Sequence, residues 1–153
     1  MLLTACSAAT PSPSVTPALT LRDLQVEPLG RTRAGIAFAF DAAAAGELVE
    51  SVPAGLDFGA SALVCVYLGE RPTTGWGLEL LAAHLLDGEL RITALERRPR
   101  ANTDDVLTYP ADCASLNRAA LPVGELVVRA DDTISDEFIV DGVVTVPPPP
   151  AAP

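Results

Sequence analysis

The sequence contains no lysine, a single histidine and few aromatic residues. All ten basic residues are arginines, and twenty acidic residues outnumber them, so the formal net charge is −10. A surface this acidic repels phosphate backbones, which argues against nucleic-acid binding. Aromatic residues make up 5% of the chain, whereas hydrophobic residues make up 49%. The core is therefore expected to consist mainly of leucine, valine and alanine.

The motifs of common enzyme sites are also missing. The sequence has neither a Gly-x-Ser-x-Gly elbow nor a phosphate-binding glycine loop. His84 has Ala83 and Leu85 as neighbours, which is typical of a sheet-surface or part-buried position, and no Cys-x-x-Cys accompanies it to suggest a metal site. The pairs Asp104-Asp105 and Asp131-Asp132 fall in predicted loops, where such carboxylates are usually solvated. We therefore predict a protein that is not an enzyme and has no metal or other cofactor.

Both ends of the chain are rich in proline and small residues. Residues 1–6 end in Leu3-Thr4-Ala5-Cys6, which resembles a bacterial lipobox, although the basic and long apolar parts of a signal peptide do not precede it. Residues 7–18 are predicted to be a tether and residues 147–153 a polyproline tail. We expect a single folded domain over residues 19–146, anchored outside the cytoplasm by lipid on Cys6. The alternative is a chance cysteine near a frayed end.

Apolar residues alternate with other residues along several short segments, as in half-buried strands. The segments are Leu21–Glu27, Gly35–Asp41, Leu90–Ala94 and Glu125–Arg129. Residues 62–68 instead form an uninterrupted apolar run, which indicates a fully buried strand. The alanines at 42–45 could begin a helical turn, but Gly46 and Pro53 leave it little room.

The segment Leu78–Leu86 fits both a helix and a strand, because Leu78, Leu81 and Leu85 recur at helical spacing. Asp87-Gly88 is a two-residue hairpin signal, however, and a hairpin needs a strand on each side. We therefore predict a strand. Asp141-Gly142 predicts a second hairpin. With about nine short strands and no long helix, we predict an all-β fold, an antiparallel β-sandwich or a partly open barrel.

The cysteines leave two interpretations open. If Cys6 carries lipid, Cys65 and Cys113 remain as an even pair, 48 positions apart. In an oxidising compartment they could bridge two strands and stabilise the fold by roughly 3–4 kcal/mol. The alternative is two unrelated buried thiols.

The most specific stretch of the chain is Gly69–Trp76. Pro72 fixes φ at a turn position and Gly75 permits positive φ, so we predict a β-arch or hairpin loop with Trp76, the only tryptophan, where the sheet resumes. The loop is either a contact site or a well-made turn with an aromatic lid. Arginine and tryptophan dominate interface hot spots. The candidate protein-binding residues are Arg71, Pro72, Thr73, Thr74, Gly75 and Trp76.

These residues resemble the C-terminal domain of the PrcB family, whose pattern is Gly-x-x-Pro-Thr-Gly-Gly-aromatic followed by alternating apolar residues. The resemblance covers about residues 61–117 and runs through Gly69, Pro72, Thr73, Gly75, Trp76, Leu78, Leu80, Gly88, Leu90, Ile92, Pro99 and Thr108-Tyr109-Pro110. Thr74 stands where a first glycine is usual, and Trp76 replaces the usual tyrosine. PrcB proteins are lipoprotein subunits named for association with a bacterial surface protease. The resemblance therefore implies an accessory module that binds or stabilises a protease.

A second resemblance gives an alternative function. Pro72-Thr73-Thr74-Gly75-Trp76 is similar to the Asn-Pro-Thr-Thr-Gly-aromatic loop of chagasin-type inhibitors, β-sandwich proteins that wedge this loop into cysteine peptidases. Arg71 occupies the asparagine position. The family's Arg-x-Pro-Trp loop is missing, because Arg97-Arg98-Pro99-Arg100 has no tryptophan after the proline. That cluster more often marks a solvated strand end.

Overall fold

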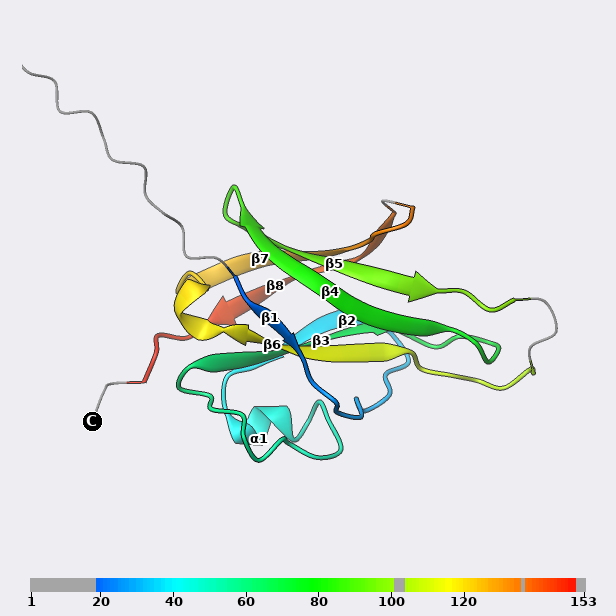
Figure 1. The fold of residues 1–153 in the computed structure, drawn as a ribbon, viewed down its shortest axis with the longest axis horizontal. Helices are drawn as coiled ribbons and strands as arrows, with labels where there is room; N and C mark the ends of the chain where they lie inside the picture. Colours follow the sequence, from blue (N-terminus) through cyan, green and yellow to red (C-terminus); the bar gives the residue numbers. More distant parts are fainter. Residues whose placement is uncertain (1–18, 101–103, 136, 151–153) are drawn as a thin grey trace, which may run out of the picture.

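The computed structural model describes residues 19–100, 104–135 and 137–150. Residues 1–18, with the predicted lipobox, Cys6 and the whole of the predicted tether, lie outside this range. The described residues form eight strands, one α-helical turn and one 3-10 turn (Figure 1). In chain order these are β1 (Leu21–Asp23), β2 (Ala34–Ala39), α1 (Ala42–Ala45), β3 (Ser61–Leu68), β4 (Gly77–Leu86), β5 (Glu89–Arg97), β6 (Ala111–Asn117), η1 (Arg118–Ala120), β7 (Gly124–Asp132) and β8 (Phe138–Val146).

The strands form two four-stranded sheets that face each other. The first sheet has the order β1-β6-β3-β2 and the second the order β4-β5-β7-β8. The prediction of an all-β sandwich is thus confirmed, with eight strands in place of nine. The ladders of the described residues are antiparallel except the one between β5 and β7, which is parallel. The intervening strand β6 belongs to the first sheet, so the chain returns to the second sheet in the same direction as β5.

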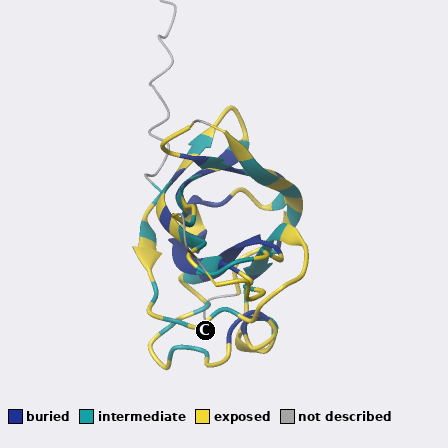
Figure 2. Ribbon diagram, turned by 90° about the vertical axis from the view of Figure 1, so that its right-hand side faces the viewer, coloured by how far each residue is buried: buried dark blue, intermediate teal, exposed yellow. Residues whose placement is uncertain are grey.

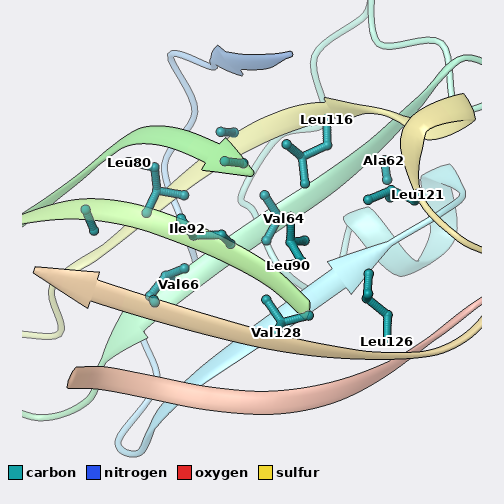
Figure 3. Close-up of a cluster of buried hydrophobic side chains, with 14 of the residues drawn as sticks. Ala62, Val64, Val66, Leu80, Leu90, Ile92, Leu116, Leu121, Leu126 and Val128 are labelled. Carbon is teal, nitrogen blue, oxygen red and sulfur yellow. The ribbon is translucent and has the colours of Figure 1, made fainter. Parts of the chain in front are cut away.

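The main core lies between the two sheets (Figure 3). Val64 and Val66 of β3 pack there with Leu90 and Ile92 of β5, and all four are essentially inaccessible to solvent. Leu126 and Val128 of β7 add to the same cluster. As the composition suggested, this core is aliphatic, with Phe38 and Phe40 packed at its margin.

The first sheet is also covered on its other face. Leu63, Cys65 and Tyr67 of β3 point away from the main core into a second cluster with Leu48 and Val49. The segment that contains α1 lies beneath this face in Figures 1 and 2. Asp41 caps α1 by accepting a hydrogen bond from the Ala44 N–H at 2.8 Å, so the four alanines form a single turn despite Gly46. Cover on both faces explains why β3 is apolar and buried from Ala62 to Leu68.

A disulfide joins Cys65 to Cys113. The two residues are direct partners in the β3–β6 ladder, with Cα atoms 4.1 Å apart. Both cysteines are fully buried in the second cluster. The bridge therefore links the two central strands of the first sheet.

The Asp87-Gly88 hairpin is confirmed, and with it the choice of strand for residues 78–86. Asp87 has φ of 52° and Gly88 φ of 82°, the left-handed pair that a tight turn between β4 and β5 requires. Burial along β4 follows the period of a strand, with Leu78, Leu80, Ala83 and Leu85 on the core side and a bulge between Leu80 and Ala82. Pairing with β5 therefore holds this segment as a strand, although its leucines recur at helical spacing.

The prediction of a hairpin at Asp141-Gly142 is wrong. Gly142 lies within the continuous strand β8, where it pairs with Val128, and its φ is not positive. The turn between β7 and β8 comes earlier in the chain. There the Asp132 carboxylate accepts hydrogen bonds from the Ser135 N–H at 3.0 Å and its hydroxyl at 2.8 Å. Asp131-Asp132 therefore ends a strand, contrary to the predicted loop position.

A buried arginine holds the start of the proline tail against the domain. Arg118 donates hydrogen bonds to the carbonyls of Phe58 and Pro148, both at 2.9 Å, and its guanidinium lies 5.4 Å from the Phe40 ring centre. No ion pair of Arg118 occurs within the described ranges. Carbonyl oxygens, and not a carboxylate, thus compensate the buried charge of Arg118. The bond to Pro148 also holds the residues that follow β8 against the first sheet.

Candidate functional site

The loop Gly69–Trp76 crosses from β3 in the first sheet to β4 in the second, so it is a β-arch. Its first residue must be glycine for two reasons. Gly69 has φ of 77°, and a Cβ atom at this position would lie 2.7 Å from the Ala34 nitrogen. The following residue, Glu70, donates its N–H to the Thr32 carbonyl at 3.1 Å. The start of the loop is thereby fixed against the segment that precedes β2.

A second loop segment, Asp104–Tyr109, braces the middle of the arch. Arg71 and Thr108 exchange two backbone hydrogen bonds of 2.9 Å, which form an isolated antiparallel bridge. The Thr108 hydroxyl donates to the Thr73 carbonyl at 3.0 Å. Thr74 and Asp104 exchange two further bonds, of 3.0 Å and 3.2 Å. These contacts hold the loop in one conformation before any partner binds.

The two predicted anchors, Arg71 and Trp76, contact each other. The Arg71 guanidinium lies 5.0 Å from the centre of the Trp76 ring, a cation–π contact. The Arg71 Nε is buried and has no hydrogen-bond partner in the described part of the chain. Both side chains are only half exposed. They are therefore part of the loop's own structure, as the interpretation of a turn with an aromatic lid expects.

The exposed part of the loop is its tip. Pro72 and Gly75 are exposed, and Gly75 has φ of 88°, which favours glycine. Beside them, Val106 and Leu107 of the bracing segment are 53% and 56% exposed. Sequence reasoning did not select these two apolar residues. The signal that could have found them was Thr108-Tyr109-Pro110, which directly follows them and belongs to the PrcB-like pattern in the sequence.

The strand that leaves the loop is fixed by Asp112 of β6. Its carboxylate accepts the Leu80 N–H of β4 at 2.7 Å and the Cys113 N–H at 2.9 Å. Burial raises the pKa of Asp112, and the nearby carboxylates of Asp23 and Glu79 raise it further, whereas the two backbone hydrogen bonds lower it. Asp112 thus connects the two sheets at the end where the loop lies.

Within the described ranges, the remaining candidate residues lie apart from one another and form ordinary surface contacts. His84 is exposed on β4 opposite Arg91. Arg97 and Arg98 are exposed at the end of β5 and form ion pairs with Glu79 and Glu137, at 2.6 Å and 2.7 Å. Among the described residues, no three histidine, cysteine or acidic side chains are close enough to hold a metal ion. None of the helices in this part of the chain has the length and apolarity that a membrane crossing requires.

The geometry therefore defines a two-sheet, all-β module with one braced loop at the end of the sandwich. Residues 62–117 match the family described as PrcB C-terminal. This match confirms, over residues 62–117, the resemblance to the PrcB family predicted from the sequence. The matched residues are just over a third of the chain and include the whole loop, its bracing segment and both cysteines of the disulfide. No curated protein and no solved structure matches the chain.

Proposed function

We propose that this protein is an extracytoplasmic, lipid-anchored accessory module that binds a protease partner through the loop Gly69–Trp76. The observation that carries the proposal is the bracing of this loop by Asp104–Tyr109, with its tip left exposed. A loop that is ordered before binding loses little entropy when the partner docks. The family match adds support, because PrcB proteins are named for association with a protease.

The contact surface in this proposal is wider than the predicted loop. Pro72 and Gly75 supply its centre, and the exposed Val106 and Leu107 extend it on one side. Arg71 and Trp76 support the tip from behind through their stacking contact. A small apolar surface of this kind suits a partner protein better than a small molecule.

The compartment in this proposal follows from the chemistry of the cysteines. A buried disulfide between central strands forms and persists in oxidising surroundings. Lipid on Cys6 would place the domain at the cell envelope. Mass spectrometry of the N-terminal peptide, which would show the added mass of the lipid on Cys6, would test the anchor independently of the loop.

The binding proposal is tested with a matched pair of substitutions. Pro72→Glu places a charge at the exposed loop tip and removes no internal hydrogen bond, because proline has no N–H. Pro122→Glu makes the same change at an exposed proline before β7, at the other end of the sandwich. Tagged full-length protein is used to capture partners from the native envelope. We expect wild type and Pro122→Glu to retain a protease and Pro72→Glu to lose it.

Equal capture by both variants, or capture of no protease by wild type, would overturn the proposal. Trp76→Ala is less informative here, because it also removes the stacking partner of Arg71. Circular dichroism and a thermal melt of each variant show whether the fold is retained.

The same rigid loop favours one other function, inhibition of a cysteine peptidase in the chagasin manner. Its residues Pro72–Trp76 keep the order of that family's wedge loop, and the bracing contacts would hold the wedge uncleaved. A papain inhibition assay separates the two functions. An accessory subunit leaves papain active, whereas inhibition that Pro72→Glu abolishes and Pro122→Glu preserves would replace our proposal.

A further inference from the structure

A hollow of about 500 Å³ lies over the outward face of the first sheet, where β2 begins. It is lined by the continuous segment Gly30–Ile36 together with Tyr67. Gly35 and Tyr67 are direct partners in the β2–β3 ladder, and Tyr67 faces the second cluster, so both belong to the outward face. A Cβ atom on Gly35 would meet nothing within 4 Å. The missing side chain therefore leaves room above the sheet for a group from another molecule.

Two arginines line this hollow and make it cationic. Arg31 and Arg33 are both exposed, and neither forms an ion pair among the residues that the structure describes. The Arg31 guanidinium lies over the Tyr67 ring, 4.8 Å from its centre, in a cation–π contact. This contact restrains Arg31 before a ligand binds, and a guanidinium has five N–H groups, so donors remain for an anion.

The neighbouring side chains do not neutralise these two charges. The carboxylate of Glu70 accepts a hydrogen bond from the Tyr109 hydroxyl at 3.4 Å and forms no ion pair with either arginine. Burial raises the pKa of Tyr67, although Arg31 acts in the opposite direction, so the phenol stays uncharged at neutral pH. In a chain of net charge −10, this hollow is a local site for an anion.

The hollow adjoins the proposed contact surface. The Glu70 N–H donates to the Thr32 carbonyl at 3.1 Å, which joins the start of the loop Gly69–Trp76 to the wall of the hollow. A Cβ atom on Gly30 would lie 3.0 Å from the Tyr109 Cβ, so the bracing segment also packs against this wall. A protein docked on the loop is therefore close to both arginines.

We propose that the hollow binds the carboxylate of a glutamate or aspartate side chain of the protease partner, through the guanidinium groups of Arg31 and Arg33. Charge-assisted hydrogen bonds would hold the carboxylate oxygens, and the space above Gly35 would admit the methylene groups. Only the identity of the partner rests on the function proposed above. Binding of the carboxylate is measured without the protease, so the two proposals can fail separately.

The probe is a short synthetic peptide with blocked ends, in which one glutamate between alanines carries the only charge. The control peptide has glutamine, the uncharged isostere, at this position. Each peptide is titrated into full-length protein at low ionic strength, and the backbone amide shifts are followed by NMR. We expect the glutamate peptide to bind at least about tenfold more tightly, with an affinity that falls as salt is added. The largest shifts should occur in residues 30–36 and at Tyr67.

A matched pair of double substitutions tests the arginines. Arg31→Gln with Arg33→Gln removes both charges of the hollow, whereas Arg22→Gln with Arg100→Gln removes two charges from other exposed positions. We expect the first protein to bind the glutamate peptide at least about tenfold more weakly than wild type and no better than the glutamine peptide. The second should bind within about twofold of wild type, since exposed charges at a distance are screened.

A second pair of substitutions tests the space in the hollow. Gly35→Val fills it with a side chain that suits a strand, and Gly142→Val makes the same change in β8, where an added Cβ atom also meets nothing within 4 Å. We expect only Gly35→Val to weaken binding of the glutamate peptide. A thermal melt of each variant shows that the fold is retained.

Equal affinity for the glutamate and glutamine peptides would overturn the proposal, and so would equal losses in the variants and their controls. If free glutarate binds as tightly as the glutamate peptide, the hollow is a site for small molecules and the assignment to a protein side chain is wrong. Pro72→Glu should bind the glutamate peptide like wild type. Capture of the protease by Pro72→Glu would thus refute the loop proposal without changing the peptide result.

Discussion

The two sheets of this sandwich have different surroundings. The first sheet packs the main core on one face and a second apolar cluster on the other, so β3 is buried along almost its whole length. The second sheet packs the core on one face only, and Val127, Val143 and Phe138 remain about half exposed on its other face. The first sheet thus provides rigidity, with its disulfide, whereas the second offers an open surface. The loop Gly69–Trp76 connects the two.

We expect the largest difference in stability between the two sheets from a matched charge substitution on the outward face of each. Leu63→Asp buries an unpaired carboxylate in the second cluster, because Leu63 is 0% exposed, and we expect the protein not to fold at 37 °C. Val143→Asp should change the free energy of unfolding by less than about 1 kcal/mol, since Val143 is 66% exposed. Urea unfolding followed by circular dichroism measures both. A similar loss of unfolding free energy in the two variants would mean that the outer faces of both sheets are covered.

The disulfide sharpens the comparison further. Replacement of Cys65 and Cys113 by serine should lower the free energy of unfolding by roughly 3–4 kcal/mol, according to the chain-entropy account of a bridge over 48 positions. Reduction of the wild type should give a similar loss. The control is the double-serine protein, whose stability should not respond to the reductant.

Arg118 tests whether the two sheets depend on each other at the end away from the loop. Arg118→Met keeps much of the apolar volume but leaves the carbonyls of Phe58 and Pro148 without their donor. We expect a loss of about 1–3 kcal/mol and faster amide exchange near the end of β8. If exchange there is unchanged, the tail is held by other contacts.

The smallest expected effects come from two aspartates with opposite pKa shifts. Folding lowers the pKa of Asp132, chiefly because its carboxylate accepts a hydrogen bond from the Glu96 N–H. The ionised carboxylate therefore stabilises the folded protein at pH values above the pKa of the unfolded chain. This stabilisation is lost as the pH falls through the pKa of the folded protein. The pKa of Asp112 is raised, chiefly by burial, so its ionisation costs stability as pH rises through the folded pKa.

These signs predict opposite pH dependence for two variants. The loss caused by Asp132→Asn should be greatest at neutral pH and shrink on acidification. The free energy of unfolding of Asp112→Asn, relative to that of the wild type, should be highest at neutral pH and lowest in acid. Unfolding free energies from pH 3 to pH 7, the range in which carboxylates titrate, provide the measurement. If the free energy of unfolding depends on pH in the same way in both variants and the wild type, the environments assigned to Asp112 and Asp132 are wrong.

Local sequence signals predicted much of the fold. The turn residues Asp87-Gly88 were sufficient to assign β4 as a strand, although its leucines recur at helical spacing. A two-residue hairpin turn requires a paired strand on each side. The apolar run of β3 indicated burial on both faces. The same kind of signal failed at Asp141-Gly142, where pairing along the whole of β7 keeps the dipeptide in an extended strand.

The features that the sequence did not reveal depend on contacts between distant segments. Nothing local shows that β6 belongs to the other sheet, and this placement is what makes β5 and β7 parallel. The stacking of Arg71 on Trp76 and the bracing by Thr108 likewise arise only when β3, β4 and β6 are assembled. The candidate loop was therefore found correctly as a loop, but its exposed tip and its internal supports could not be distinguished.

The open face of the second sheet and the braced loop are two competing places for a partner to bind. The most direct measurement is amide hydrogen exchange of the full-length protein, alone and in complex with the proposed protease partner. Our account predicts slower exchange in residues 70–76 and 104–109, with little change on the outer strands β7 and β8. Protection of β7 and β8, with the loop unchanged, would contradict the account and move the interface to the second sheet.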